Sequence, residues 1–189
     1  MGGASHWPGE NGALPRRRFL VCAATLLAVA APRKPAAGQD ETRLKPPSVI
    51  VPVTPPKPLP PLVFTTLDGR KLPLAAFAGK PLVLNFWATW CMPCVAELPE
   101  LDQLAAQGIQ VLAVSADHRG ADAVKPFLAT RNLDHLTIAL DRTSEATHEA
   151  GVFGFPTTFV LDTQGRERGR LEGPAKWSEA ADTIRHLAD

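Results

Sequence analysis

Two cysteines in the segment Trp90-Cys91-Met92-Pro93-Cys94 carry the clearest chemical signal in this sequence. A two-residue spacer on the first turn of a helix brings two thiols close enough to form a disulfide that can open again. At a helix N-terminus, unpaired backbone N–H groups and the helix dipole favour a thiolate. We therefore expect Cys91 to be the nucleophile of thiol–disulfide exchange and Cys94, one turn further on, to be the shielded resolving thiol.

A structural zinc site and an inert disulfide are the competing interpretations of this Cys-x-x-Cys motif. A zinc site needs two further ligands at suitable spacing. The third cysteine, Cys22, lies in an N-terminal apolar segment, and the five histidines form no His-x-x-x-His pair. We therefore favour a redox-active pair, and we expect no metal ligands and no cofactor.

The residues around the cysteines predict the elements that position them. Residues 81–87 form a short, nearly continuous apolar run, which is typical of a central strand covered on both faces. Pro93 falls in the first helical turn, where a proline is tolerated. Apolar residues then recur at helical spacing, with an expected kink at Pro99, until Gly108 ends the helix. A strand–turn–helix unit thus places Cys91 at the start of a helix.

The rest of the chain alternates between predicted strands and helices. We predict a hairpin over 62–72 with its turn at Asp68-Gly69, a helical turn at 74–77, strands at 109–115, 136–140, 157–161 and 167–171, and helices at 121–131, 144–150 and 178–187. Ser144 and Ser178 are candidate N-caps. This order predicts an α/β fold with a central mixed β-sheet flanked by helices and an N-terminal β-hairpin extension.

Residues 1–31 have the pattern of an export signal. Arg16–Arg18 form a charged region, and the 13 residues of the apolar segment 19–31 follow. Crossing a bilayer needs about 20 residues, so we expect a cleaved signal, with a retained anchor as the alternative. The order Arg16-Arg17-x-Phe19-Leu20 is similar to the twin-arginine consensus, although Pro15 replaces the preferred Ser or Thr. We expect export to the periplasm or to the outer face of the cytoplasmic membrane.

Export would leave the Cys-x-x-Cys pair as the only cysteines, so they would not serve as a structural scaffold. Ten prolines between Pro32 and Pro61 predict an extended linker, which we assign to 32–56, ahead of a redox domain at 57–189. Without residues 1–31 the chain has 17 basic and 18 acidic residues, and the formal net charge changes from +1 to −1. This balance leads us to expect no nucleic-acid partner. Separately, we expect the protein to be a monomer.

A second motif, Gly154-Phe155-Pro156-Thr157-Thr158, places a proline directly before a predicted strand. A cis bond before Pro156 would turn the chain sharply and expose neighbouring backbone groups, whereas an ordinary trans loop proline is the alternative. Together the two motifs resemble proteins of the thioredoxin fold. More narrowly, the chain resembles the TlpA/ResA-like thiol-disulfide oxidoreductases over about residues 57–189. The narrower resemblance rests on Asn85-Phe86-Trp87-Ala88-Thr89-Trp90-Cys91, Glu97-Leu98-Pro99, Leu67-Asp68-Gly69 ahead of Gly79-Lys80, and the export signal.

The resemblance implies a role for each matching residue. Cys91 matches the attacking cysteine, Cys94 the resolving cysteine, and Pro156 a cis-proline that faces the disulfide. Glu97 matches a buried acid whose pKa burial raises toward the range of proton transfer, although a surface helix residue is the alternative. Cytosolic thioredoxins have a buried aspartate where this chain has Asn85, so the acid–base role would pass to Glu97. The expected substrate contacts are Trp90, Met92, Pro93, Phe155, Pro156 and Thr157.

The resemblance also implies a function. We expect an exported disulfide reductase that acts on envelope proteins such as apocytochrome c or copper-site proteins and receives electrons from a membrane thiol donor. The Met92-Pro93 spacer is closer to that of reducing members than to that of oxidising ones. A disulfide oxidase or isomerase is one alternative. A copper-binding protein that uses the two thiols as soft ligands, without exchange activity, is the other.

Overall fold

A computed structural model of the chain describes residues 49–188, so the predicted export signal and most of the predicted linker lie outside the described residues. The strands are β1 (Val51–Pro58), β2 (Val63–Thr66), β3 (Lys71–Pro73), β4 (Leu82–Trp87), β5 (Gln110–Ser115), β6 (Thr137–Leu140), β7 (Thr157–Leu161) and β8 (Arg166–Glu172). The α-helices are α1 (Met92–Ala106), α2 (Ala121–Leu128), α3 (Glu145–Glu149) and α4 (Ala181–Ala188), and the 3-10 helices are η1 (Leu74–Phe77) and η2 (Trp177–Glu179). Among the described residues, no helix is both long and apolar enough to cross a membrane.

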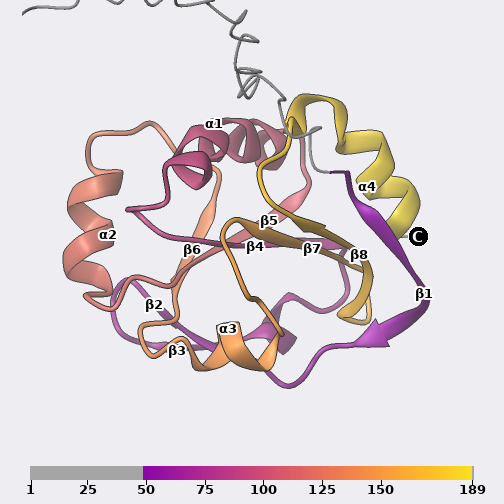
Figure 1. Cartoon of the computed structure of the whole chain (residues 1–189), viewed down its shortest axis with the longest axis horizontal. Coiled ribbons are helices and arrows are strands. Elements are labelled where there is room, and N and C mark those ends of the chain that lie inside the picture. The colour runs from indigo at the N-terminus through magenta and orange to yellow at the C-terminus, as the bar shows by residue number, and fades with distance from the viewer. Residues whose placement is uncertain (1–48, 189) are drawn as a thin grey trace, which may run out of the picture. The chain divides into compact units, whose positions relative to one another are not determined.

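The strands form one mixed sheet in the order β1-β8-β7-β4-β5-β6-β2-β3 (Figure 1). β4 is parallel to β5 and antiparallel to β7, and β5 is parallel to β6. The β2–β3 hairpin joins the sheet because β2 pairs with β6, with Thr65 opposite Leu140. The predicted mixed α/β fold and its N-terminal hairpin are therefore confirmed.

β4 lies at the centre of this sheet and is buried on both faces, as its apolar run predicts. Alternate side chains enter different cores. Val83 and Trp87 pack in the core that includes Leu98 of α1, whereas Leu84 and Phe86 pack with residues of η1 and α3. Helices α1, α2 and α4 accordingly cover one face of the sheet, and α3 covers the other (Figure 1). η1 packs in the same core as α3.

The proline-rich segment contains a strand where we expected only a tether. β1 pairs antiparallel with β8 at the edge of the sheet, from Val51 opposite Arg170 to Pro58 opposite Arg166, with an irregularity between Pro52 and Lys57. Proline cannot donate to a strand ladder, but an edge strand needs hydrogen bonds on only one side. The predicted boundary at residue 56 therefore falls inside a strand of the folded domain.

The C-terminal helical region begins with a cap that we did not predict. Ser178 lies inside η2, and α4 follows as a separate helix. The Glu100 carboxylate of α1 accepts the backbone N–H groups of Trp177 (2.6 Å) and Ser178 (3.2 Å). Ser144 also makes no side-chain cap bond at the start of α3. Ser144 occupies the N-cap position, but the Asp141 carboxylate accepts the backbone N–H of Thr147 (2.7 Å) instead. In both places a carboxylate takes the capping role that we predicted for the serine side chain.

Candidate active site

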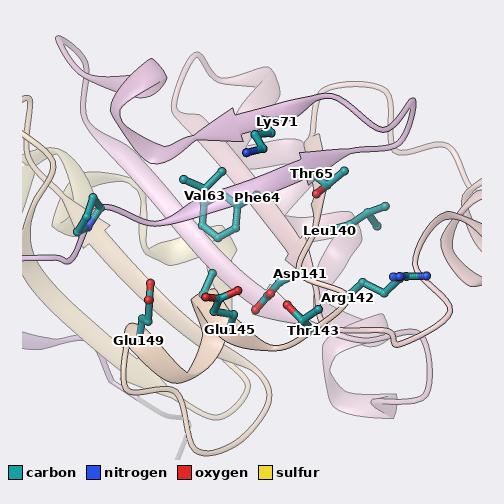
Figure 2. Close-up of a pocket in the computed structure, with 12 residues that line it drawn as sticks. Val63, Phe64, Thr65, Lys71, Leu140, Asp141, Arg142, Thr143, Glu145 and Glu149 are labelled. Atoms are coloured by element: carbon teal, nitrogen blue, oxygen red, sulfur yellow. The ribbon is translucent and has the colours of Figure 1, made fainter.

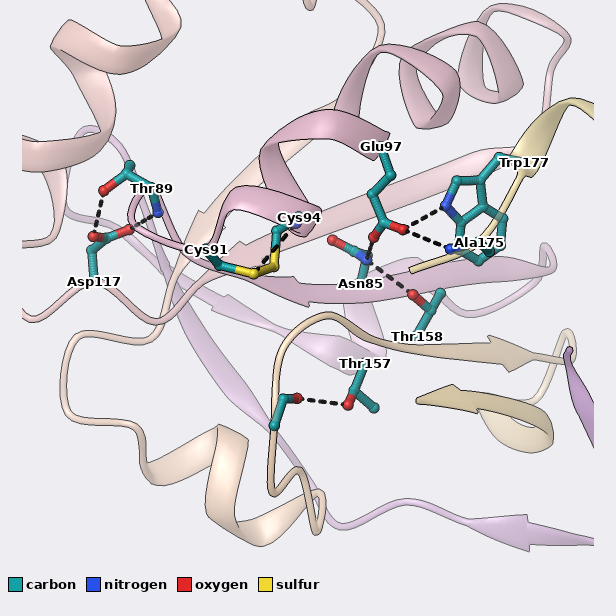
Figure 3. The surroundings of a disulfide bond; sticks show 11 residues. Asn85, Thr89, Cys91, Cys94, Glu97, Asp117, Thr157, Thr158, Ala175 and Trp177 are labelled. Atoms are coloured by element: carbon teal, nitrogen blue, oxygen red, sulfur yellow. Dashed lines mark hydrogen bonds between the residues drawn. A yellow bond between two sulfur atoms is a disulfide. The ribbon is translucent and has the colours of Figure 1, made fainter. Parts of the chain in front are cut away.

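The two cysteines lie where the strand–turn–helix pattern predicts, at the start of α1 (Figure 3). They form a disulfide with a Cα–Cα distance of 5.3 Å. Cys91 is the N-cap residue, and its sulfur accepts the backbone N–H of Cys94 at 3.3 Å. Cys91 is 6% exposed to solvent, whereas Cys94 is completely buried. The position at the helix N-terminus and the greater access both favour Cys91 as the attacking sulfur.

A buried carboxylate that the sequence analysis missed, Asp117, holds the turn between β4 and α1. Its oxygens accept from Thr89 N (2.9 Å) and Thr89 Oγ1 (2.7 Å) (Figure 3). They also accept from Ser115 Oγ (2.7 Å). Because β4 and β5 are parallel, with Trp87 opposite Ser115, their C-terminal ends meet at one edge of the sheet. An acidic residue just after the predicted β5 strand was the available signal for this anchor.

Glu97 is buried, as the resemblance implied, and is only 3% exposed to solvent. Three donors surround its carboxylate (Figure 3). Asn85 Nδ2 donates to Oε1 at 3.0 Å, while Ala175 N (3.2 Å) and Trp177 Nε1 (3.1 Å) donate to Oε2. The Ala175 and Trp177 donors come from the segment after β8, almost 80 residues away in sequence, so no local pattern indicated them.

Burial raises the pKa of Glu97 from 4.5 to about 7. The hydrogen bonds from Trp177, Ala175 and Asn85 oppose this effect, and the charge of Glu100 adds to it. Glu97 is three residues after Cys94 on α1, so both side chains share one face of the helix. A carboxyl group with this pKa can accept or return a proton near neutral pH.

Asn85 connects this carboxyl group to the strand that follows Pro156. Its two Nδ2 hydrogens go to Glu97 Oε1 and to Thr158 Oγ1 (2.9 Å). Its Oδ1 atom is buried and has no hydrogen-bond partner among the described residues. Both Nδ2 hydrogens of Asn85 are thus engaged in hydrogen bonds, whereas its Oδ1 atom accepts none from the described residues.

The predicted cis bond before Pro156 is confirmed. Of the expected substrate contacts, four line an open cavity of about 660 Å³ beside Cys91, namely Trp90, Met92, Pro93 and Phe155. The other two, Pro156 and Thr157, are buried and are not part of its lining. The Trp90 and Phe155 rings meet edge to face, with centroids 5.8 Å apart. The cavity therefore presents a mainly aromatic and aliphatic wall next to the redox pair.

Phe153 belongs to this cavity although the sequence analysis did not select it. Its side chain is 95% exposed, and Trp90 and Met92 are also well exposed. Large apolar side chains that are grouped and exposed indicate a binding surface. Phe153 lies in the short loop between Gly151 and Gly154 beside the buried Val152, so no pattern in the sequence distinguished the exposed residue from the buried one.

A second hollow of about 490 Å³ lies between the β2–β3 hairpin and α3 (Figure 2). Side chains of both charges line it, with Lys71 and Arg142 positive and Glu145 and Glu149 negative. It contains neither cysteine. Within residues 49–188, no group of three or more His, Cys, Asp or Glu side chains is arranged to hold a metal ion.

Comparison with known proteins agrees with this geometry. The family described as Redoxin matches residues 54–184. Thiol-disulfide oxidoreductase ResA of Bacillus thuringiensis subsp. konkukian is 36% identical over 121 residues, which are 62% of this chain and 69% of that protein. Thiol:disulfide interchange protein DsbE of Vibrio cholerae is 34% identical over 154 residues, which are 77% of this chain and 78% of that protein.

A solved structure, of a putative thiol:disulfide interchange protein DsbE from Chlorobium tepidum, is similar to this fold with a TM-score of 0.63 and 30% identity. The similarity covers 70% of this chain and 96% of that one. The Redoxin match includes Cys91, Cys94, Glu97 and Pro156 and extends over more than half of the chain. The chain therefore belongs to the Redoxin family, as a TlpA/ResA-like thiol-disulfide oxidoreductase of the thioredoxin superfamily.

Proposed function

We propose that this protein is an exported disulfide reductase that acts on protein disulfides in the cell envelope. The observation that carries the proposal is the combination at the start of α1. Cys91 is the N-cap residue and its sulfur accepts a backbone N–H, while Glu97, with a pKa of about 7, lies on the face of the helix that carries Cys94. These features provide a nucleophilic thiolate and a proton acceptor in one helix.

Reduction of a substrate would proceed in two exchanges. The Cys91 thiolate attacks the substrate disulfide, so a bond forms between Cys91 and one substrate sulfur, and the other substrate sulfur leaves as a thiolate. The Cys94 thiol then gives its proton to the Glu97 carboxylate, and its sulfur attacks Cys91. The substrate leaves as a dithiol after protonation. The substrate has then been reduced by two electrons, and the enzyme has been oxidised by two electrons to the Cys91–Cys94 disulfide.

The cavity beside Cys91 supports a protein substrate. Its exposed wall of Trp90, Met92, Phe153 and Phe155 suits apolar side chains that flank a substrate cysteine. We assign Pro156 the role of orienting the backbone before it, so that an extended substrate segment can pair with it. Thr157 Oγ1 donates to the Gly154 carbonyl at 2.8 Å and supports this loop.

Export and partners rest on the sequence. The signal pattern in residues 1–31 supports export, and the similarity to ResA and DsbE proteins supports action on protein disulfides. By resemblance, we assign apocytochrome c or copper-site proteins as substrates and a membrane thiol protein as the electron donor. The protein would act as a monomer.

A trapping experiment tests this function. In Cys94→Ala the mixed disulfide with Cys91 has no resolving thiol, so the physiological substrate should remain covalently attached. The variant would be expressed as the full chain in the native cell, and attached proteins would be identified by mass spectrometry after non-reducing purification. The Cys91→Ala, Cys94→Ala double variant is the control. An absence of trapped envelope proteins, with reductase activity retained in Cys94→Ala, would contradict the mechanism.

The direction of electron flow is tested separately by the redox potential. A reductase requires a potential near the reducing end of the thioredoxin-like range, about −270 mV for thioredoxin. Equilibration of the full chain with glutathione buffers measures it. A potential near the oxidising end, about −120 mV, would contradict the reductase function and would favour a disulfide oxidase.

A further inference from the structure

The unpartnered carboxamide oxygen of Asn85 is the feature that the mechanism above does not use. Asn85 is completely buried, and its Oδ1 atom finds no donor among residues 49–188. A buried acceptor without a donor costs about 1–3 kcal/mol, so such a group in a native site calls for an explanation. The oxidised state leaves this acceptor free, and the reduced state adds one donor that has no access to solvent.

That donor is the thiol of Cys94. Asn85 is on β4 with its side chain on the same face of the sheet as Val83 and Trp87, which pack in the core that contains Cys94. In Figure 3 the Asn85 oxygen points away from the Glu97 carboxylate, toward the side on which the Cys94 sulfur lies. In the disulfide, the Cys94 sulfur has no hydrogen to donate. Once reduced, it carries an S–H in a place with no access to solvent.

The orientation of the carboxamide is fixed by its other partners. An ionised carboxylate can only accept hydrogen bonds, so the Glu97 oxygen requires the Nδ2 side of Asn85. The second Nδ2 hydrogen goes to Thr158 Oγ1. With both hydrogens placed, Oδ1 must face away from them, and it remains available to a donor on the α1 side.

We propose that Asn85 Oδ1 accepts the Sγ–H of Cys94 in the reduced enzyme, so that Asn85 is a positioning residue joining the resolving thiol to Glu97. The inference rests on the proposed roles of Cys91 and Cys94. On reduction by a dithiol, two electrons and two protons are added, the Cys91–Cys94 bond breaks, and the donor becomes a disulfide. One proton resides on Cys94 and points to Oδ1, which keeps Cys94 protonated until it gives the proton to Glu97. The other proton resides on Cys91 and passes to solvent when Cys91 becomes the attacking thiolate.

The S–H stretching band in the infrared tests this contact directly, because a hydrogen bond lowers its frequency. In a full chain carrying Cys22→Ser and Cys91→Ser, Cys94 is the only thiol, so the band belongs to it. The spectrum would be taken at about pH 8, where Glu97, with its pKa of about 7, is mostly ionised. Adding Asn85→Leu, which has nearly the same shape but no acceptor, should shift the band to higher frequency.

Gln110→Met is the matched control, because Gln110 Oε1 is also buried without a partner among the described residues. It removes a comparable acceptor away from the cysteines and should leave the band unchanged. An unchanged band in Asn85→Leu would show that Oδ1 serves another partner, such as a water molecule, and would overturn the proposal. A band that shifts equally in both variants would overturn it as well, because the effect would then be general.

The dithiol–disulfide equilibrium gives a second, independent readout. Asn85→Leu removes the hydrogen bond from the reduced state and the unpaired acceptor from the oxidised state, and both changes favour the disulfide. We expect the equilibrium constant with glutathione to move roughly tenfold toward the disulfide, about 30 mV for a two-electron couple. An unchanged constant would contradict the proposal. Neither measurement uses a protein substrate, so failure to trap a substrate with Cys94→Ala leaves this test intact.

Discussion

Glu97→Gln should remove most of the dependence of protein stability on pH between about pH 4.5 and 7. The pKa of Glu97 rises from 4.5 in the unfolded reference to about 7 in the folded protein. Each pKa unit corresponds to about 1.4 kcal/mol, so this difference corresponds to about 3 kcal/mol. Because Glu97 is almost completely buried, solvent screening reduces this value little. Burial of the charged carboxylate is the dominant cause.

The sign of the effect follows from proton linkage. A folded-state pKa above the unfolded value means that the folded protein binds the proton more tightly. The contribution of Glu97 to stability is therefore fully present below about pH 4.5 and is lost as the pH rises through about 7. Glutamine has no proton to lose, so the variant should lack this decline.

Urea unfolding of the oxidised full chain, at constant salt and at closely spaced pH values between about 4 and 8.5, measures the effect. The difference in unfolding free energy between the parent protein and Glu97→Gln should change by about 3 kcal/mol across this range. Glu100→Gln is the control, because Glu100 also lies on α1 and accepts N–H groups from the same C-terminal segment. It should keep the decline and move its midpoint slightly lower, since the charge of Glu100 helps to raise the pKa of Glu97. Parallel curves for the parent and Glu97→Gln would refute the reasoning.

Three further predictions concern the surroundings of the disulfide. Asp117→Ala leaves the Thr89 turn without its acceptor, so stability to urea should fall by about 1–3 kcal/mol and exchange should slow. Equal stability would contradict the anchoring role. Phe153→Ser removes an exposed side chain, so stability should change by less than about 0.5 kcal/mol while KM for a protein disulfide rises several-fold. A large loss of stability with unchanged KM would place Phe153 in the core instead. Trp177→Phe removes a donor to Glu97, so the midpoint of the pH–stability curve should move up by about one pH unit.

Much of the redox site could be predicted because its chemistry is local in sequence. The apolar run before the cysteines and the Cys-x-x-Cys spacing specified β4, the turn and the start of α1. The prolines at positions 93 and 99 are both inside α1, and neither prevents it. The cis bond before Pro156 followed from its place directly before a strand together with the family resemblance.

The predictions from sequence failed where the hydrogen-bonding partners of a segment come from distant parts of the chain. Residues 51–56 looked unable to join a sheet, because four prolines between Val51 and Pro58 remove backbone donors. Whether such a segment can pair depends on whether a neighbouring strand offers a free edge, and β8 does. Likewise, Ser178 had the residue type of a cap, but the fold placed the Glu100 carboxylate at that position.

The sequence by itself determined the reactive pair, the strand–turn–helix unit that presents it and the presence of an acid three residues after Cys94. These features depend only on residue types and on short spacings along the chain, so they can be predicted without knowledge of the tertiary structure. Only the tertiary structure decided the protonation chemistry of that acid. Burial against the sheet raises the pKa of Glu97, and donors from Asn85 and from the segment after β8 oppose the rise. A pKa reflects every group packed around a carboxyl, and packing unites residues that are almost 80 positions apart.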